Sequence, residues 1–456
     1  MTGADDLRQR ALRGAAYLAA SYLASAVLKL VGVFVIARQL GPAGYGSYVA
    51  GFAFVQFPFA AAQAGLAARL LRDEKCRPEA PALLLLLAAG VMLPLWLAAP
   101  ALGAHSGIDG LANIVALLAL ALPLQFGVLP ATAALERRLA YREIALIELG
   151  GQLLFYAVAI TSIVLGLGPS ALAIGFIAQQ AGQTVAAWRL SGVRLRITRD
   201  GRAMRAIIAD AWTLTAAHAV FSLRLLVAPL LVAPVLGAHA IGVIGMTVAI
   251  VETLAGLKAV AWRMSLSLAA RLGDQRDRLA RAIRQGRDGQ VLLLGGLLLG
   301  AGLAIETVVP LLFGPRWGEV HRLYPFVALA MLVNAAATPR LALLAMTGHD
   351  RMVLFVNAAH IALFATACAL LSPRFGLLGY GLAELIALGV YALVAFGPAA
   401  AHGGDEGRGF GLVWTVAIGL SLFWRDIGVW ALAMPAVALP VLLAGVRRHR
   451  RRARPA

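Results

Sequence analysis

Charged residues are scarce in this sequence, and acidic residues are the scarcest. Only 14% of the 456 residues are Asp, Glu, Lys or Arg, and 22 acidic residues face 40 basic ones. A soluble domain carries about 25% charged residues, so this composition excludes a globular protein whose whole surface faces water. The rest of the composition agrees, because 61% of the residues are hydrophobic and the mean hydropathy is +0.82. We therefore predict an all-α integral membrane protein.

Cysteine and clustered catalytic side chains are also lacking. Cys76 and Cys368 are the two cysteines, and they lie in different segments with no metal-binding or redox spacing. No Asp, Glu and His constellation stands out, and the longest external loop is about ten residues. Enzymes that process lipid-linked sugars outside need a domain or long loop there to hold catalytic groups. These absences favour a transporter over an enzyme, and we expect no cofactor.

Long apolar segments are what the chain has in place of these features. About fourteen stretches of roughly 20 residues are long enough to cross a bilayer as helices. They cover residues 15–37, 45–67, 80–99, 111–134, 143–165, 169–188, 207–234, 240–262, 290–312, 323–343, 351–371, 376–398, 409–424 and 428–446. The first run is too long for a signal peptide, so we expect a retained helix.

The net charge of +18 is distributed by side of the membrane. With the N-terminus inside, cytoplasmic segments carry 31 of the 40 Lys and Arg residues, if Arg351 at the cytoplasmic end of its span is counted with them. External loops carry five, and four others fall within spans. This asymmetry follows the positive-inside rule. It predicts a membrane protein with both termini in the cytoplasm, whose basic segments contact anionic membrane lipids and not nucleic acid.

A short motif between the first two spans is repeated later in the chain. Residues 37–48 read ARQLGPAGYGSY, where Gly41 and Pro42 stop the first helix and predict a tight turn. Residues 236–244 read LGAHAIGVI, with the same spacing of Leu-Gly and apolar-Gly pairs, 196 residues further on. The chain is therefore predicted to be a duplicated transporter, in which each half has an even number of spans and enters the membrane in the same orientation.

The duplication predicts three segments. The first is an N-terminal six-helix bundle with its cytoplasmic linker, residues 1–205, in which positions 189–205 include six Arg. The second is a C-terminal six-helix bundle, residues 206–408. The third, residues 409–456, holds two extra helices and a basic cytoplasmic tail.

Four stretches, taken in order, resemble a known family. They are ARQLGPAGYG at 37–46, ERRLAYREI at 136–144, LFGPRW at 312–317 and GHDR at 348–351. Together they are similar to the polysaccharide flippases of the multidrug/oligosaccharidyl-lipid/polysaccharide exporter superfamily, over most of the first twelve spans. The resemblance implies two six-helix bundles about a pseudo-two-fold axis along the membrane normal, with a central cavity. It also implies alternating access that flips an undecaprenyl-pyrophosphate-linked oligosaccharide, a repeat unit of lipopolysaccharide or exopolysaccharide, to the periplasmic leaflet.

Ionisable side chains inside the predicted spans are the candidate site residues, because a charge among lipid tails usually faces a cavity or a partner. Subtracting the repeat offset places Arg224 one position from Lys29 and places Glu252 on Gln56. Equivalent helices therefore carry a cation at nearly the same depth, and a polar group in the next helix. The other candidates are Asp210, Lys258, Glu306, Arg340 and Glu384.

A pyrophosphate would suit a paired cationic seat. We therefore predict a cavity site formed by Lys29, Arg224, Gln56, Glu252 and Ser25, in which Ser25 and Lys29 share one helix face. The alternative is that Lys29 and Arg224 snorkel to an interface and that Glu252 neutralises one of them.

The remaining intramembrane groups have simpler interpretations. Lys258 and Arg340 lie toward cytoplasmic ends and are expected to snorkel, and Asp210 and Glu306 are expected to be structural. The remaining polar groups are expected to form hydrogen bonds between helices; they are Glu384, His360 and Asn357.

Two rival functions remain open. A multidrug or cation antiporter of the same fold would need acidic groups in its cavity. In the cavity predicted for this chain, cations match or outnumber acids. A membrane glycosyltransferase or polymerase is disfavoured by the short external loops. The coupling ion, Na+ or H+, and any contact with other polysaccharide assembly proteins are left open by the sequence.

Overall fold

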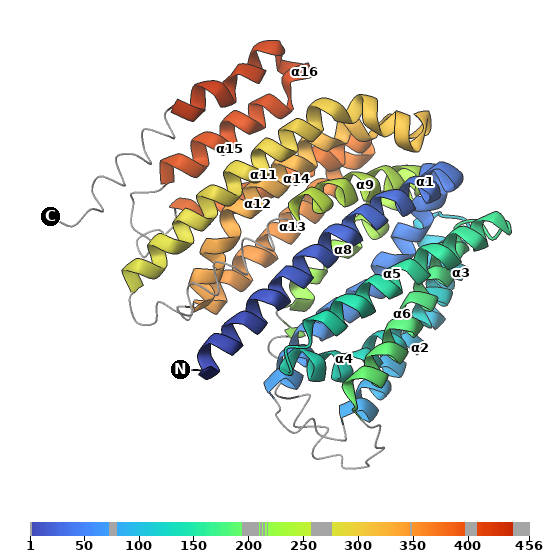
Figure 1. The fold of residues 1–456 in the computed structure, drawn as a ribbon. Helices are drawn as coiled ribbons and strands as arrows, with labels where there is room; N and C mark the ends of the chain where they lie inside the picture. Colours follow the sequence, from blue (N-terminus) through green and yellow to red (C-terminus); the bar gives the residue numbers. More distant parts are fainter. Residues whose placement is uncertain are drawn as a thin grey trace. The chain divides into compact units, whose positions relative to one another are not determined.

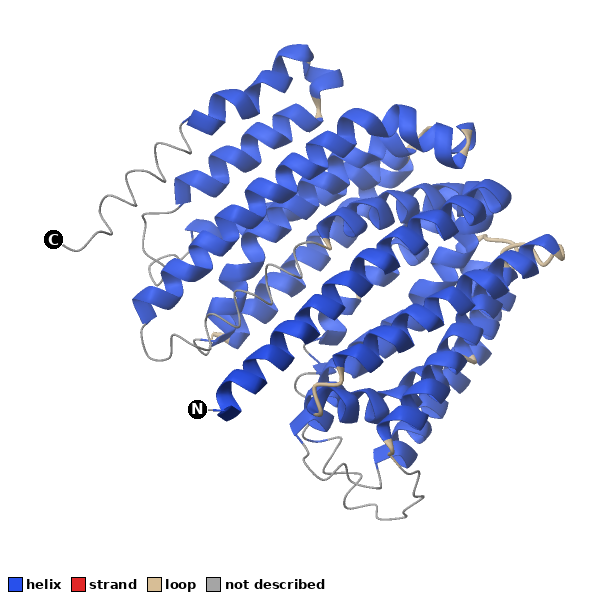
Figure 2. Ribbon diagram, viewed as in Figure 1, coloured by secondary structure: helices blue, strands red, loops and turns tan. Residues whose placement is uncertain are grey.

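The computed structural model describes residues 2–72, 80–193, 218–256, 276–346, 349–396 and 408–440, together with positions 209, 212, 215 and 216. Within these residues every regular element is a helix and none is a strand (Figure 2). The predicted all-α class is therefore confirmed for the described part of the chain.

The chain divides into two compact units, Met1–Val243 and Ile244–Ala456. The helices of the first unit are coloured blue to green in Figure 1. They are α1 (Thr2–Arg72), α2 (Ala80–Ser106), α3 (Leu111–Ala119), α4 (Leu122–Arg137), α5 (Tyr141–Val164), α6 (Ser170–Ser191), α8 (Arg224–Val227), the π-helical turn η1 (Ala228–Val232) and the start of α9 (Ala233–Ala255).

The second unit contains the end of α9 and all later elements. They are α11 (Arg276–Phe313), η2 (Pro315–Trp317), α12 (Val320–Met346), α13 (Asp350–Phe375), α14 (Leu377–Phe396), α15 (Arg408–Leu422), α16 (Trp424–Ile427) and η5 (Val429–Ala433). The segment boundaries predicted at 205/206 and 408/409 stay predictions, and residues 194–205 of the predicted linker lie outside the described residues.

The described helices are long and apolar enough for a multi-pass membrane protein. Eight of them qualify by length and composition as membrane spans, and three shorter apolar helices follow. Two of the eight, 27–67 and 218–255, each cover two of the predicted spans. The multi-pass prediction is confirmed, whereas the number of fourteen spans stays a prediction.

The duplicated motif forms the same backbone kink in both places. Helix α1 is interrupted at Gly41, where φ is 65° and ψ is −179°. Helix α9 is interrupted at Gly237, where φ is 73° and ψ is −176°. A positive φ is costly for any residue with a Cβ, which explains the glycine at both positions. The predicted tight turn is therefore present as a single-residue kink, repeated 196 residues later.

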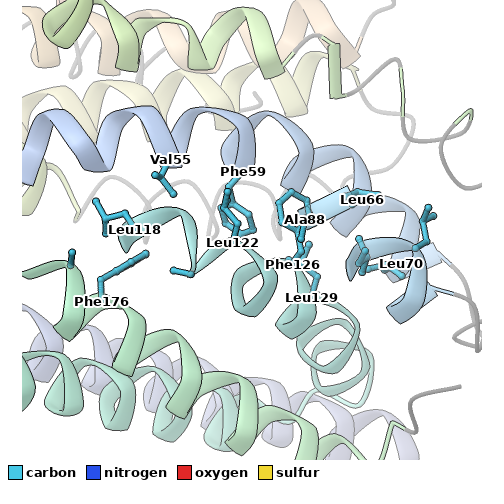
Figure 3. Packing of buried hydrophobic residues seen from close by; sticks show 14 of the residues in the cluster. Val55, Phe59, Leu66, Leu70, Ala88, Leu118, Leu122, Phe126, Leu129 and Phe176 are labelled. Carbon is cyan, nitrogen blue, oxygen red and sulfur yellow. The ribbon is translucent and has the colours of Figure 1, made fainter. Parts of the chain in front are cut away.

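An apolar cluster between α1, α2, α3, α4 and α6 forms the core of the first unit. Phe59 and Phe126 meet edge to face, with ring centroids 5.3 Å apart (Figure 3). Leu122 and Leu118 are fully buried beside them. Because lipid is as apolar as this core, close packing rather than water exclusion holds such helices together.

Both units contain a tightly packed helical hairpin from the second part of each predicted repeat. In the first unit α5 packs along α6, and in the second α13 packs along α14. A glycine with positive φ lies in each connection, Gly168 (φ 55°) and Gly376 (φ 59°). The two helices that follow the repeats begin with α15, which packs on α11 and α12 within the second unit.

Candidate functional site

The backbone of α1 at Ser25 and Lys29 is docked against α5. The side chain of Gln152 donates from Nε2 to the carbonyl O of Ser25 at 3.3 Å, and Tyr156 donates from its hydroxyl to the carbonyl O of Lys29 at 3.4 Å. Donors and acceptors are both four residues apart, so each pair lies on one helix face. These contacts fix the backbone from which the half-buried Lys29 side chain projects.

A glycine on α1 lets this docking occur. A Cβ placed on Gly32 would lie 2.1 Å from two ring carbons of Tyr156, so the ring occupies the space that a side chain would need. Gly32, Gln152 and Tyr156 were not among the site residues predicted from the sequence. A glycine within a span, facing a polar pair at four-residue spacing, is the signal that marks such close helix packing.

Arg224 is held in a short, irregular part of the chain. It is the first residue of α8, which packs against α1, and its side chain is half-buried. The next five residues form the π-helical turn η1, and the ring Nε2 of His105 donates to the carbonyl O of Leu230 in this turn at 2.9 Å. Lys29 and Arg224 are thus carried by two elements of the first unit that pack against each other, and the cationic seat stays a prediction.

Gln56 makes an interhelical hydrogen bond that the sequence did not reveal. Its Oε1 accepts a hydrogen bond from Nε2 of Gln125 on α4 at 3.2 Å. Gln125 is 2% exposed, and the described residues give its own Oε1 no partner. A buried hydrogen bond between two side-chain amides joins α1 to α4. The half-buried Gln56 is therefore engaged within the first unit, and its proposed contact with a ligand stays a prediction.

Glu252 lies on the part of α9 that belongs to the second unit, and its side chain is exposed. A carboxylate in the middle of a span is tolerated where it meets water or a partner. Its repeat equivalent, Gln56, instead forms the hydrogen bond with Gln125. The two halves therefore differ in chemistry at this matched position.

Two of the other intramembrane acids have distinct surroundings. Glu306 forms an ion pair with Arg425, which links α11 to α16 and agrees with the structural role expected for it. Glu384 is 1% exposed on α14. Asp210 and Lys258 lie outside the described residues, and the side chain of Arg340 is not described either.

The ring of His360 makes one of the expected interhelical contacts. Its Nδ1 lies 3.0 Å from the carbonyl O of Ala387, which joins α13 to α14. Among the described residues, no group of three or more His, Cys, Asp and Glu side chains could hold a metal ion.

The sequence profile described as "Polysaccharide biosynthesis protein" matches residues 35–322, which is more than half of the chain. The search of curated proteins gives no significant match.

Solved structures of membrane transporters share the fold at low sequence identity. The lipid II flippase MurJ in an inward closed conformation matches with a TM-score of 0.72 and 11% identity, over 95% of this chain and 98% of MurJ. An inward-facing multidrug resistance MATE family transporter of the MOP superfamily matches with a TM-score of 0.61 and 13% identity, over 84% and 97%. The eukaryotic MATE transporter AtDTX14 gives 0.58 and 16%, over 94% and 99%.

Proposed function

Because the chain belongs to the polysaccharide biosynthesis protein family, we propose that it flips a polyprenyl-pyrophosphate-linked oligosaccharide across the bacterial inner membrane by alternating access. The multi-pass helical fold, shared with flippases and transporters, supports a transport role over catalysis. The observation that carries the choice of an anionic substrate is the pair of cations, Lys29 on α1 and Arg224 on the adjoining α8.

A pyrophosphate fits this pair for chemical reasons. It carries several negative oxygens that accept charge-assisted hydrogen bonds, and these are about twice as strong as neutral ones. Arginine can grip two oxygens at once, whereas the lysine ammonium acts as a point charge. The docking of α1 on α5 through Gln152 and Tyr156 would hold the lysine in place for this contact.

A second candidate is a multidrug or cation antiporter of the same fold. The exposed carboxylate of Glu252 within a span favours it, because an acid facing water can exchange protons or sodium for a cationic substrate. The flippase stands first because the family match concerns polysaccharide biosynthesis and because Lys29 and Arg224 outnumber Glu252 among the candidate site residues.

Reconstituted vesicles can separate these two functions. Purified protein should move a fluorescent polyprenyl-pyrophosphate oligosaccharide between leaflets, measured by the fraction of label that an external quencher reaches. The same lipid with a single phosphate should move more slowly, because it offers fewer oxygens to the two cations. Gradient-driven uptake of a cationic dye, without movement of the glycolipid, would contradict the flippase and support the antiporter.

The orientation in the membrane is a separate proposal. The distribution of Lys and Arg places the N-terminus, the 189–205 linker and the C-terminal tail in the cytoplasm. Reporter fusions at Gly192, at Gly286 and at the C-terminus should all show cytoplasmic activity. Periplasmic activity at any of the three sites would refute this topology.

A further inference from the structure

The two copies of the duplicated motif contact each other through their backbones. A Cβ placed on Gly46 would lie 1.9 Å from the carbonyl O of Ala238, and a Cβ placed on Gly242 would lie 1.9 Å from the carbonyl O of Pro42. All four residues belong to the first unit. The contact is reciprocal, because Gly46 corresponds to Gly242 and Pro42 to Ala238 at the repeat offset of 196 residues.

Only glycine fits at either position. Real Cβ atoms essentially never come within 3.0 Å of another heavy atom, and the neighbours here are backbone atoms, which cannot rotate away. The missing side chain lets the Cα of one helix approach a carbonyl of the other, a geometry that also permits weak Cα–H···O contacts. The crossing therefore depends on the absence of a single carbon atom on each side.

The matched kinks set the crossing up. Pro42 and Ala238 directly follow Gly41 and Gly237, so the carbonyls that meet the partner glycines belong to the first turn after each kink. The predicted topology places both turns at the external ends of their spans. Beside the crossing, Ser47 is 6% exposed, and its hydroxyl donates a local hydrogen bond to the carbonyl O of Ala43 at 3.1 Å.

We infer that the Gly46–Gly242 crossing is a gate contact that holds the turns of the two motif copies, at Pro42–Gly46 and Ala238–Gly242, closed against each other in this conformation. Two conformations of a transporter differ by a few kcal/mol, so a contact made in only one of them sets their populations. A Cβ at either glycine prevents the close approach and shifts the population toward an externally open state. This inference rests on alternating access in the proposed function, but its test needs no transported substrate.

Thiol labelling measures this opening. In a background with Cys76 and Cys368 replaced by alanine, Ser47→Cys places a reporter thiol beside the crossing. A membrane-impermeant maleimide should label it slowly in the parent protein. Gly46→Ala and Gly242→Ala should each raise the labelling rate about tenfold or more, in intact cells and not in inverted vesicles. The double variant should label no faster than the faster single one, because both changes break the same contact.

Matched glycines control for general loosening. Gly44→Ala lies in the same turn, and its Cβ would meet mainly side-chain atoms, with the Cβ of Leu40 at 3.2 Å; Gly90→Ala on α2 would meet nothing within 4 Å. Both should label at the parental rate, and all variants should keep the parental membrane abundance. A labelling rate equal to that of the parent in folded Gly46→Ala and Gly242→Ala proteins would contradict the proposed gate.

If one variant fails to fold, the other tests the same contact from the opposite helix. Loss of glycolipid flipping with unchanged labelling would count against the gate alone.

Discussion

Lys29→Ala and Arg224→Ala should each reduce glycolipid flipping by about 10- to 100-fold. A hydrogen bond to a charged group contributes about 1.5–3 kcal/mol, and each 1.4 kcal/mol corresponds to about a factor of ten. Both residues are half-buried on packed elements of the first unit. The measurement is the initial flipping rate in reconstituted vesicles, at equal amounts of protein.

The loss of flipping rate should result from removal of the charge and not from changed packing of the side chain. Lys29→Arg should retain most of the activity, whereas Lys29→Met, which keeps the length without the charge, should behave like Lys29→Ala. Glu306→Gln is the control for removing a charge outside the predicted site, and it should leave the flipping rate near the parental value. Glu306 forms an exposed ion pair with Arg425, and such pairs contribute little to stability. Full activity in both alanine variants would refute the cationic seat.

The two cations should also act as one seat. If both hold the same pyrophosphate, the double variant Lys29→Ala/Arg224→Ala should be only slightly worse than either single variant. Two side chains that snorkel independently should instead give small effects that add. Additive losses in the flipping rate would therefore support snorkelling and contradict the shared seat.

Gly32→Leu should destabilise the first unit strongly, because the new side chain must enter the space that Tyr156 occupies. A Cβ alone would lie 2.1 Å from two carbons of the ring. Overpacking in a filled interior typically costs about 1–3 kcal/mol, and here it would also separate the carbonyl of Lys29 from the tyrosine hydroxyl. The expected result is a lower thermal unfolding midpoint and a lower flipping rate per folded molecule.

Gly150→Leu is the matched control for this change. Gly150 lies on α5, on the same helix as Tyr156, and a Cβ there would meet nothing within 4 Å. It should therefore leave both the unfolding midpoint and the flipping rate near their parental values. Equal losses in the Gly150 and Gly32 variants would mean that glycine is required for helix flexibility and not for the close packing of α1 on α5.

The sequence determined the features that depend on composition and on local backbone chemistry. The shortage of charge and the long apolar runs were enough to predict a multi-pass helical protein, because a bilayer admits few other structures. The spacing of Leu-Gly pairs predicted a duplication, and Gly41 and Gly237 do adopt the same left-handed kink. These predictions held because a kink at glycine depends on the residue and its neighbours in the chain.

The tertiary structure decided which side chains meet. The hydrogen bond of Gln56 with Gln125, 69 residues away, could not be read from the sequence. Gly32 and Tyr156 lie on different helices, and their contact depends on the rotation of each helix about its axis. Nor could spacing alone show that Gly46 and Gly242 cross each other's backbone. The rotation of a membrane helix about its axis is set by how its side chains pack against neighbouring helices. Those neighbours are known only from the folded structure.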